Sequence, residues 1–195
     1  QRTVELSIKE LEDELDLRRC TPWEIASKLV AKSGEIFEEK LAEARKMVEE
    51  SVREIYGTTG IRKLERALRN LAMQHGGETI EEIFAYILRS YNIKYERKKN
   101  VGTSEFPAEA DFVIPSLSTL KVRPSCAIII SVKRKVRERW RLTLGDAYIL
   151  RAIHNYPDNI WFVTLVSGIN EVDLPKKAVK VFTKLHIRVY VPDPV

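Results

Sequence analysis

Two long apolar runs in the second half of the chain constrain the fold most. CAIIISVK (126–133) and NIWFVTLV (159–166) are apolar at consecutive positions, which is typical of strands covered on both faces of a sheet. The segments that follow them, 137–156 and 174–185, have the three- and four-residue apolar spacing of amphipathic helices. Strands that alternate with helices predict an α/β fold in which helices flank a central mixed β-sheet.

The first half of the chain has a helical pattern instead. TPWEIASKLV predicts the start of a helix, with Thr21 as N-cap and Glu24 completing a capping box. GTTG (57–60) is expected to break the pattern. The helix after this break is expected to end at Gly76–Gly77, and another helix is expected over 78–91.

The length of the chain limits the number of domains. A chain of 195 residues can build one sizeable core but hardly two. We therefore expect a single domain over 1–195, with a helical portion over about 1–92 and an α/β portion over about 93–195. Further short strands are expected over 92–100, 110–115 and 187–192.

Positive charge is concentrated in one segment. Between Leu117 and Arg141 there are eight Lys or Arg residues and one acid, a net charge of +7, whereas the whole chain carries +5. A focused basic patch on a nearly neutral body favours a polyanionic partner, above all a nucleic acid. A solvated helix face is an equally good explanation of the charge taken alone.

Membrane and secretory classes do not fit the sequence. No apolar stretch approaches the roughly 20 residues that a membrane-spanning helix needs. The beginning, QRTVELSIKE, carries charges where a secretory signal needs an apolar centre. Cys20 and Cys126 fit no metal-binding spacing, and Cys126 is expected to open a core strand. We therefore expect a cytoplasmic protein without a membrane partner.

Asp111, Lys133 and Asp146 are candidates for a catalytic site. Lys133 ends the expected strand, Asp111 lies in the short strand before it, and Asp146 follows Lys133 by thirteen residues. Carboxylates can hold Mg²⁺, which activates a bound water, and an ammonium group can stabilise charge on phosphorus. From the residue types alone, an exposed aspartate and a surface lysine are the simpler alternative.

A family resemblance strengthens the catalytic interpretation. Asp111, followed at a distance by SVKRKVRERW (131–140), resembles the split carboxylate–SxK arrangement of restriction endonucleases in the PD-(D/E)XK nuclease superfamily. The Arg-Glu-Arg-Trp string and an acid thirteen residues after the lysine are similar to the branch that contains SsoII and EcoRII. The resemblance is strongest from Arg69 to Asp146, and it implies the restriction-endonuclease-like fold.

The resemblance implies a role for each candidate residue. Asp111 and Asp146 would be ligands of a Mg²⁺ cofactor, and Lys133 would be the catalytic lysine. Glu78 would be an additional acid near the active site, although a glutamate in the first turn of a helix is also favoured by the helix dipole. Two positions depart from the family pattern: Ala110 stands where Pro is common, and Asp146 stands where relatives often carry Glu.

The resemblance also implies residues that contact DNA. Arg137, Glu138 and Arg139 would read G·C pairs, because Arg donates to guanine and Glu accepts from cytosine in the major groove. Trp140 is expected to pack the following helix onto the sheet. Lys135 would contact phosphates, and Arg69 would approach the target. Phe37 would either stack on an extruded central base or pack on the buried side of its helix.

The implied function is a Mg²⁺-dependent type II restriction endonuclease acting on double-stranded DNA. The branch cuts short sites with CC and GG around a central base or base pair, which corresponds to CCWGG or CCNGG. A palindromic site favours a homodimer with two-fold symmetry. Two alternatives remain open: another nuclease of the superfamily acting in repair or on junctions, and a catalytically inactive DNA-binding module on the same scaffold.

Overall fold

The computed structural model describes residues 8, 11–12, 14–134, 140–156, 159–165 and 174–191. By its contacts the chain divides into two compact units, Gln1–Ile83 and Phe84–Val195. Within the described ranges, no helix combines the length and the apolar character needed to cross a membrane. The first unit is helical, and the second contains the sheet.

The first unit consists of the 3₁₀ turn η1 (Leu17–Arg19) and most of the long helix α2 (Pro22–Ser90). The predicted capping box is present at the start of α2. The Thr21 N–H donates to Glu24 Oε2 at 2.6 Å, and the Glu24 N–H donates to Thr21 Oγ1 at 3.3 Å. These two bonds satisfy amide donors that the first turn of a helix leaves without partners.

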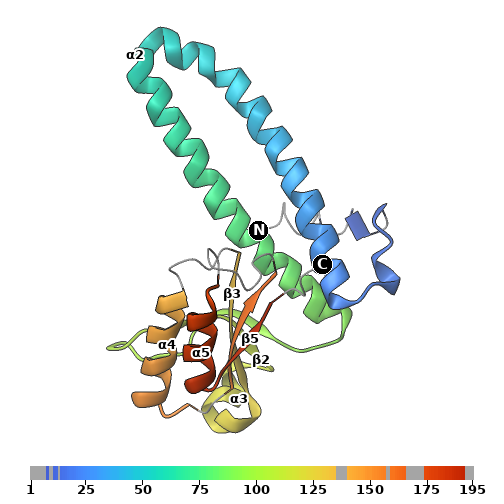
Figure 1. The fold of residues 1–195 in the computed structure, drawn as a ribbon, viewed down its shortest axis with the longest axis vertical. Coiled ribbons are helices and arrows are strands. Elements are labelled where there is room, and N and C mark those ends of the chain that lie inside the picture. The colour runs from blue at the N-terminus through green and yellow to red at the C-terminus, as the bar shows by residue number, and fades with distance from the viewer. Residues whose placement is uncertain are drawn as a thin grey trace. The chain divides into compact units, whose positions relative to one another are not determined.

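Gly57 folds α2 back on itself and makes it a helical hairpin (Figure 1). Its φ of 58° and ψ of −151° are accessible to glycine and strained for other residues, so the predicted break is confirmed at this position. The predicted helix end at Gly76–Gly77 is wrong, because α2 continues through both glycines to Ser90. Glycine costs a helix only about 1 kcal/mol, and strong helix formers on both sides outweigh that cost.

The second unit contains a five-stranded mixed sheet. The strands are β1 (Glu96–Asn100), β2 (Glu109–Ile114), β3 (Ile128–Lys133), β4 (Ile160–Thr164) and β5 (Ile187–Tyr190), and they lie in that order. β1, β2 and β3 pair antiparallel, whereas β3, β4 and β5 pair parallel. This arrangement confirms the predicted α/β class with a mixed sheet.

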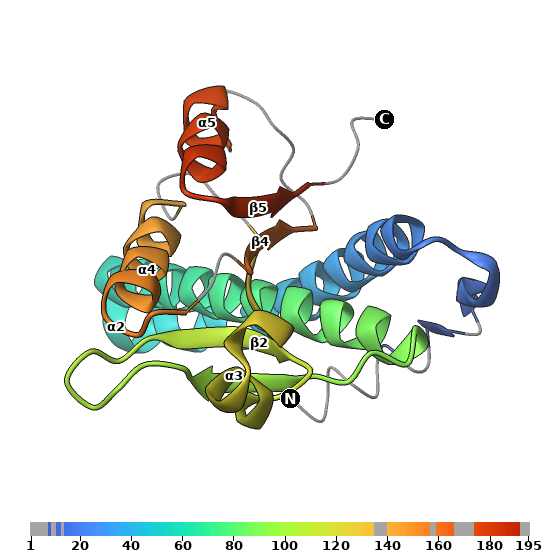
Figure 2. The ribbon, with the colours of Figure 1, turned by 90° about the horizontal axis from the view of Figure 1, so that it is seen from below.

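Helices pack against the sheet and build its core. α4 (Trp140–Ala152) and α5 (Lys176–Lys184) provide the crossovers between the parallel strands, while α3 (Leu117–Val122) and the turn η2 (Pro124–Cys126) join β2 to β3 (Figures 1 and 2). The Trp140 ring meets Phe182 edge-on at 6.3 Å, as expected for a residue that packs α4 onto the core. The buried cluster includes Val113, Ile129, Ala147, Leu150, Phe162, Ala178 and Phe182.

Cys126 does not open the core strand, contrary to expectation. It belongs to η2, its side chain is exposed, and β3 begins two residues later at Ile128. Pro124 starts this short turn, where its fixed φ is favourable and its missing N–H is not needed. The apolar run therefore predicted the start of the strand two residues too early.

Substitutions of two glycines in α2 test the hairpin. A β-carbon added at Gly60 would lie 2.5 Å from Tyr56 Cβ and 3.0 Å from Val52 Cγ1, whereas one added at Gly77 would meet nothing within 4 Å. We expect Gly60→Ala to lower the free energy of unfolding by about 1–3 kcal/mol through overpacking. Gly77→Ala should raise it by about 0.5–1 kcal/mol, because alanine favours the helix. Urea denaturation of both variants measures the difference, and equal effects would contradict the tight bend.

Candidate active site

The pairing of β2 with β3 brings Asp111 next to the end of β3. Phe112 is paired with Ile130 in this antiparallel register, so the preceding residue, Asp111, lies beside Ser131. Strand alternation directs Phe112 into the core, where it is fully buried, and leaves Asp111 on the other face and half-buried. The carboxylate is thereby presented beside Ser131 and Lys133.

Three donors from β3 converge on one oxygen of Asp111. Oδ2 accepts from the Val132 N–H at 2.7 Å, from Lys133 Nζ at 2.9 Å and from Ser131 Oγ at 3.3 Å. The Lys133–Asp111 ion pair is partly shielded, with side chains 30% and 15% exposed, respectively. The shielding makes the attraction stronger than that of a surface pair. All three donors use Oδ2, and Oδ1 accepts no hydrogen bond from the described part of the chain, so it can take another ligand.

Asp146, on α4, lies within electrostatic reach of this pair. Asp146 is exposed as a residue, but partial burial of its carboxyl raises its pKa above the ordinary value, and the negative charge of Asp111 raises this pKa further. The positive charge of Lys133 lowers the pKa and partly offsets both effects. The three predicted residues are therefore close enough for their charges to interact, although Asp146 makes no hydrogen bond to the described part of the chain.

The donor set fits a hard divalent cation. Oδ1 of Asp111 and the carboxylate of Asp146 provide oxygen ligands, which Mg²⁺ prefers, and Mg²⁺ commonly uses one or two carboxylates with waters completing its shell. A cation bound beside Asp146 would lower its raised pKa, as the charge of Lys133 already does in part. Within the described ranges, no group of three or more His, Cys, Asp and Glu residues gathers to form a larger site.

Glu78 lies within α2 in the first unit. It is half-buried, and its Oε1 accepts from Gln74 Nε2 at 3.5 Å. The expectation of a first-turn glutamate next to a helix N-terminus is wrong, because α2 is continuous through this position. The helix dipole therefore does not explain Glu78, and its assignment as an additional acid stays a prediction.

The predicted DNA-contacting residues have different local environments. Phe37 is half-buried and stacks on His75 within the first unit, with ring centroids 4.1 Å apart and planes 12° apart. Arg69 is exposed on α2. Lys135, Arg137, Glu138 and Arg139 lie outside the described residues, so their roles also stay predictions.

Sequence reasoning missed the backbone amide of Val132 as a partner of Asp111. An amide carries no side-chain signature, and only the strand register identifies which N–H faces the carboxylate. The available signal was the SxK pattern beside a short strand containing Asp111, which is consistent with antiparallel pairing. This amide helps to hold the carboxylate in one orientation.

Comparison with solved structures identifies restriction endonucleases. A complex of restriction endonuclease PspGI with substrate DNA aligns with a TM-score of 0.80 and 31% identity, covering 96% of this chain and 74% of that chain. Metal-depleted Ecl18kI with uncleaved, modified DNA aligns with a TM-score of 0.67 and 15% identity, covering 96% of this chain and 68% of that chain. No protein-family model and no curated protein sequence matches the chain.

The mixed sheet, with a carboxylate–lysine pair on adjacent strands, defines the restriction-endonuclease-like class of α/β proteins. With 31% identity across 96% of its length, the chain belongs to the type II restriction endonuclease family of PspGI. The family resemblance recognised in the sequence is thereby confirmed. The Ecl18kI match, at 15% identity, supports the fold alone.

The raised pKa of Asp146 predicts a pH-dependent effect on stability. A carboxyl whose pKa is higher in the folded than in the unfolded protein weakens the fold once it ionises. Without divalent cations, Asp146→Asn should therefore raise the melting temperature at pH 7.5. The gain should disappear below about pH 3.9, the ordinary pKa of aspartate, because both proteins are then neutral at this position. Thermal melts of both proteins in EDTA, at pH 7.5 and below about pH 3.9, measure the two differences in melting temperature. A lower melting temperature of Asp146→Asn at pH 7.5 would contradict the raised pKa of Asp146.

Proposed function

We propose that the chain is a Mg²⁺-dependent type II restriction endonuclease that hydrolyses phosphodiester bonds of duplex DNA. Its site is a short palindrome containing CC and GG, of the CCWGG or CCNGG kind. The observation that carries the proposal is the Asp111–Lys133 pair, 2.9 Å apart and within electrostatic reach of Asp146. Membership in the family of PspGI, which was solved with substrate DNA, supports the choice of substrate.

Each residue of this cluster has a defined task in the proposed reaction. Asp111 and Asp146 hold Mg²⁺, which when bound lowers the pKa of a water ligand and offsets charge on the phosphate. The Lys133 ammonium orients the attacking water and stabilises the negative charge that develops on the phosphate oxygens. The Val132 N–H and Ser131 Oγ hold the Asp111 carboxylate in position through their bonds to Oδ2.

Sequence recognition is assigned to residues around the site. Arg137, Glu138 and Arg139 read adjacent G·C pairs in the major groove, and Lys135 contacts phosphates. Arg69 approaches the target and Glu78 adds an acid near the active site. Phe37 stacks on a central base that is rotated out of the duplex. His75 already covers one face of the Phe37 ring, so a base would have to stack on the other face.

A homodimer completes the proposed enzyme. A palindromic duplex presents the same sequence on both strands, and cutting both strands needs two active sites related by two-fold symmetry. Each copy supplies its own Asp111, Lys133 and Asp146 to one strand.

Replacing Lys133 tests the catalytic assignment. Incubation of plasmid DNA with the unsubstituted protein and Mg²⁺ should give discrete fragments, and EDTA should prevent the cleavage. Lys133→Ala should lower the cleavage rate about 100-fold or more, because it removes a group that stabilises transition-state charge. Lys184→Ala, at the exposed C-terminal end of α5, is the matched control and should cleave normally. Gel electrophoresis measures both rates, and sequencing of the fragment ends determines the site and the cut position.

The alternatives give different results in this experiment. A non-specific smear would indicate another nuclease of the superfamily. DNA binding without cleavage by the unsubstituted protein would indicate an inactive DNA-binding module.

Replacing Arg137 tests base reading. Arg137→Ala should weaken binding to the cleavage site by about 1–3 kcal/mol while binding to an unrelated duplex changes little, since a bidentate contact to guanine discriminates by that amount. Lys135→Ala should weaken binding to both duplexes equally and reduce its salt dependence, as expected for a phosphate contact. Fluorescence anisotropy with Ca²⁺ in place of Mg²⁺ gives the affinities. Equal losses on both duplexes for Arg137→Ala would contradict base reading.

A further inference from the structure

A second concentration of positive charge lies in the segment that contains α5 and β5. From Leu174 to Val191 there are five Lys or Arg residues and no Asp or Glu. None of these basic residues takes part in the cleavage or the base reading proposed above. The charge of this segment therefore calls for an explanation of its own.

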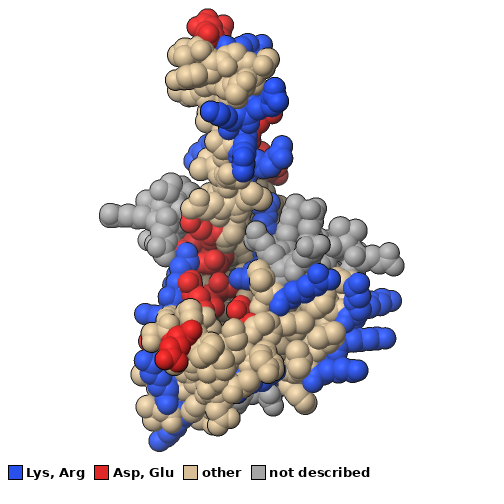
Figure 3. Space-filling model, turned by 90° about the vertical axis from the view of Figure 1, so that its left-hand side faces the viewer, with Lys and Arg blue, Asp and Glu red and all other residues tan. Residues whose placement is uncertain are grey.

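α5 has an apolar inner side and a basic outer side. Ala178 and Phe182 are fully buried, and the Phe182 ring stacks on Phe162 with centroids 5.1 Å apart. The lysines occupy the opposite side of the helix and are all exposed: Lys176, Lys177, Lys180 and Lys184. In Figure 3, Lys and Arg side chains gather along the right-hand edge of the unit that contains the sheet, with no acid among them. Because the inner side is packed on the core, the lysines project from a backbone that is held in place.

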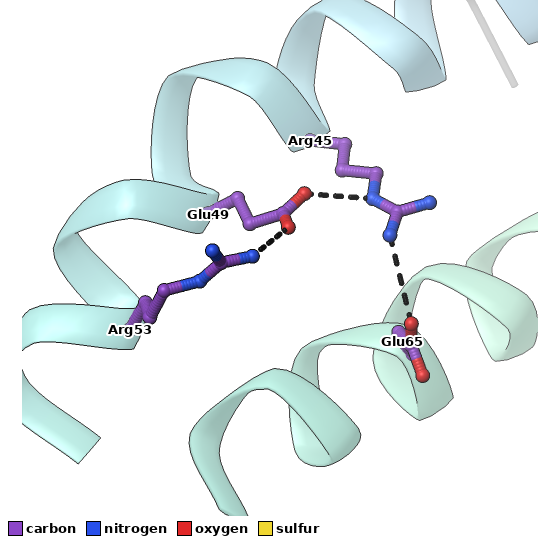
Figure 4. A network of polar contacts seen from close by, with 4 residues as sticks. All are labelled: Arg45, Glu49, Arg53 and Glu65. Carbon is purple, nitrogen blue, oxygen red and sulfur yellow. Dashed lines mark hydrogen bonds and ion pairs between the residues drawn. The ribbon is translucent and has the colours of Figure 1, made fainter. Parts of the chain in front are cut away.

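The lysines of α5 lack the acidic neighbours that basic residues have in α2. There, Glu49 accepts from Arg45 Nε and from Arg53 Nη2, each at 2.9 Å (Figure 4). Lys176 and Lys180 are instead four positions apart, and two positive charges at this spacing destabilise a helix. None of the four lysines forms an ion pair with a described residue. Positive charge that lowers the stability of its own helix favours a polyanionic partner over a merely solvated surface.

The topology of the sheet places one end of α5 at the catalytic edge. β4 ends at Thr164, which is paired with Lys133 in the parallel register. β5 begins at Ile187, soon after the end of α5 and level with the start of β4 at the opposite edge. α5 therefore runs back along the sheet, with Lys176 toward the catalytic edge and Lys184 toward the far edge (Figures 1 and 2).

A duplex bound at the catalytic site has further phosphates at the distance of this end of α5. Neighbouring strands are about 4.8 Å apart and packed layers about 10 Å apart, so the start of α5 lies on the order of 10–15 Å from the end of β3. One DNA strand carries a phosphate about every 3.4 Å along the duplex axis. The first lysines of α5 therefore lie at the distance of phosphates about three to four nucleotides from the one assigned to Lys133.

We propose that Lys176, Lys177 and Lys180, which we call the α5 basic face, bind backbone phosphates of the duplex outside the recognition site. The proposal rests on the proposed function, because the same duplex must occupy the catalytic site. Phosphate contacts carry no sequence information, but they fix the register and orientation of a duplex on a protein. The α5 basic face thereby holds the flanking DNA and helps to align the cleaved strand with the catalytic cluster. Lys184, toward the far edge, lies outside this face.

The dependence of affinity on duplex length tests the proposal. Two duplexes carry the cleavage site found from the fragment ends, one with about two flanking base pairs on each side and the other with about ten, which adds the phosphates within reach of α5. Fluorescence anisotropy with Ca²⁺ in place of Mg²⁺ should show that the unsubstituted protein binds the longer duplex about 10-fold or more tightly at low salt. The variant Lys176→Ala/Lys177→Ala/Lys180→Ala should lose most of this gain and bind the shorter duplex with unchanged affinity. Circular dichroism should show unchanged helix content, because alanine is a strong helix former.

The salt dependence of binding separates a contact surface from net charge alone. With the longer duplex, Lys180→Ala should reduce the slope of log affinity against log salt concentration by about one for each α5 basic face that contacts the duplex, as expected for one lost phosphate contact. Lys184→Ala is the matched control: it removes the same charge one helical turn away on the same outer side, and it should leave the slope unchanged. Lys180→Arg should also keep the slope, because the charge is retained.

The outcomes separate this proposal from the proposed function. Cleavage by the unsubstituted protein, together with an unchanged preference of the triple variant for the longer duplex, overturns the role of the α5 basic face and leaves the proposed function intact. Equal effects of Lys180→Ala and Lys184→Ala on the slope overturn that role as well, because net charge then accounts for the loss. An unsubstituted protein that neither binds nor cleaves any duplex overturns the proposed function and this proposal with it.

Discussion

The contact on which the site depends is the convergence of three β3 donors on Oδ2 of Asp111. The Val132 amide at 2.7 Å, Lys133 Nζ at 2.9 Å and Ser131 Oγ at 3.3 Å hold one carboxylate oxygen, and no other described residue bonds to the second oxygen. A shift of the β2–β3 register by one residue would turn Asp111 away from Ser131 and Lys133 and disturb the packing of Phe112 and Val113, which are both fully buried. The packing of the sheet and the chemistry of the site therefore depend on the same register.

Two acids and one base lie near this contact, so the cluster has one more acidic than basic group. Lys133 compensates Asp111, whereas Asp146 is held in a partly desolvated position with its pKa raised by burial and by Asp111. Such a carboxylate costs stability when it ionises, and the cation that we propose to be held by the two aspartates would reduce that cost.

The two units use different physical means to reach a stable structure. The second unit buries Phe112, Phe162 and Phe182 completely and has a core of its own. The hairpin carries surface ion pairs such as Arg45–Glu49, while Ile55 on its first leg and Leu71 on its second leg stay exposed. A sheet covered by helices can complete its core alone, whereas two helices in contact leave much of their apolar surface in water unless further helices cover it.

The sequence by itself determined the α/β class, the capping box at Thr21, the break at Gly57 and the family, because these depend on local spacing and on residue types near in sequence. It did not determine that α2 continues through Gly76–Gly77. The two glycines destabilise the helix, the residues on both sides stabilise it, and no local motif shows which contribution is larger. It also pointed to Asp111, Lys133 and Asp146 without establishing that they meet. Only the tertiary structure decided that, since antiparallel pairing of β2 with β3 and the position of α4 bring together groups up to 35 residues apart in sequence, from Asp111 to Asp146.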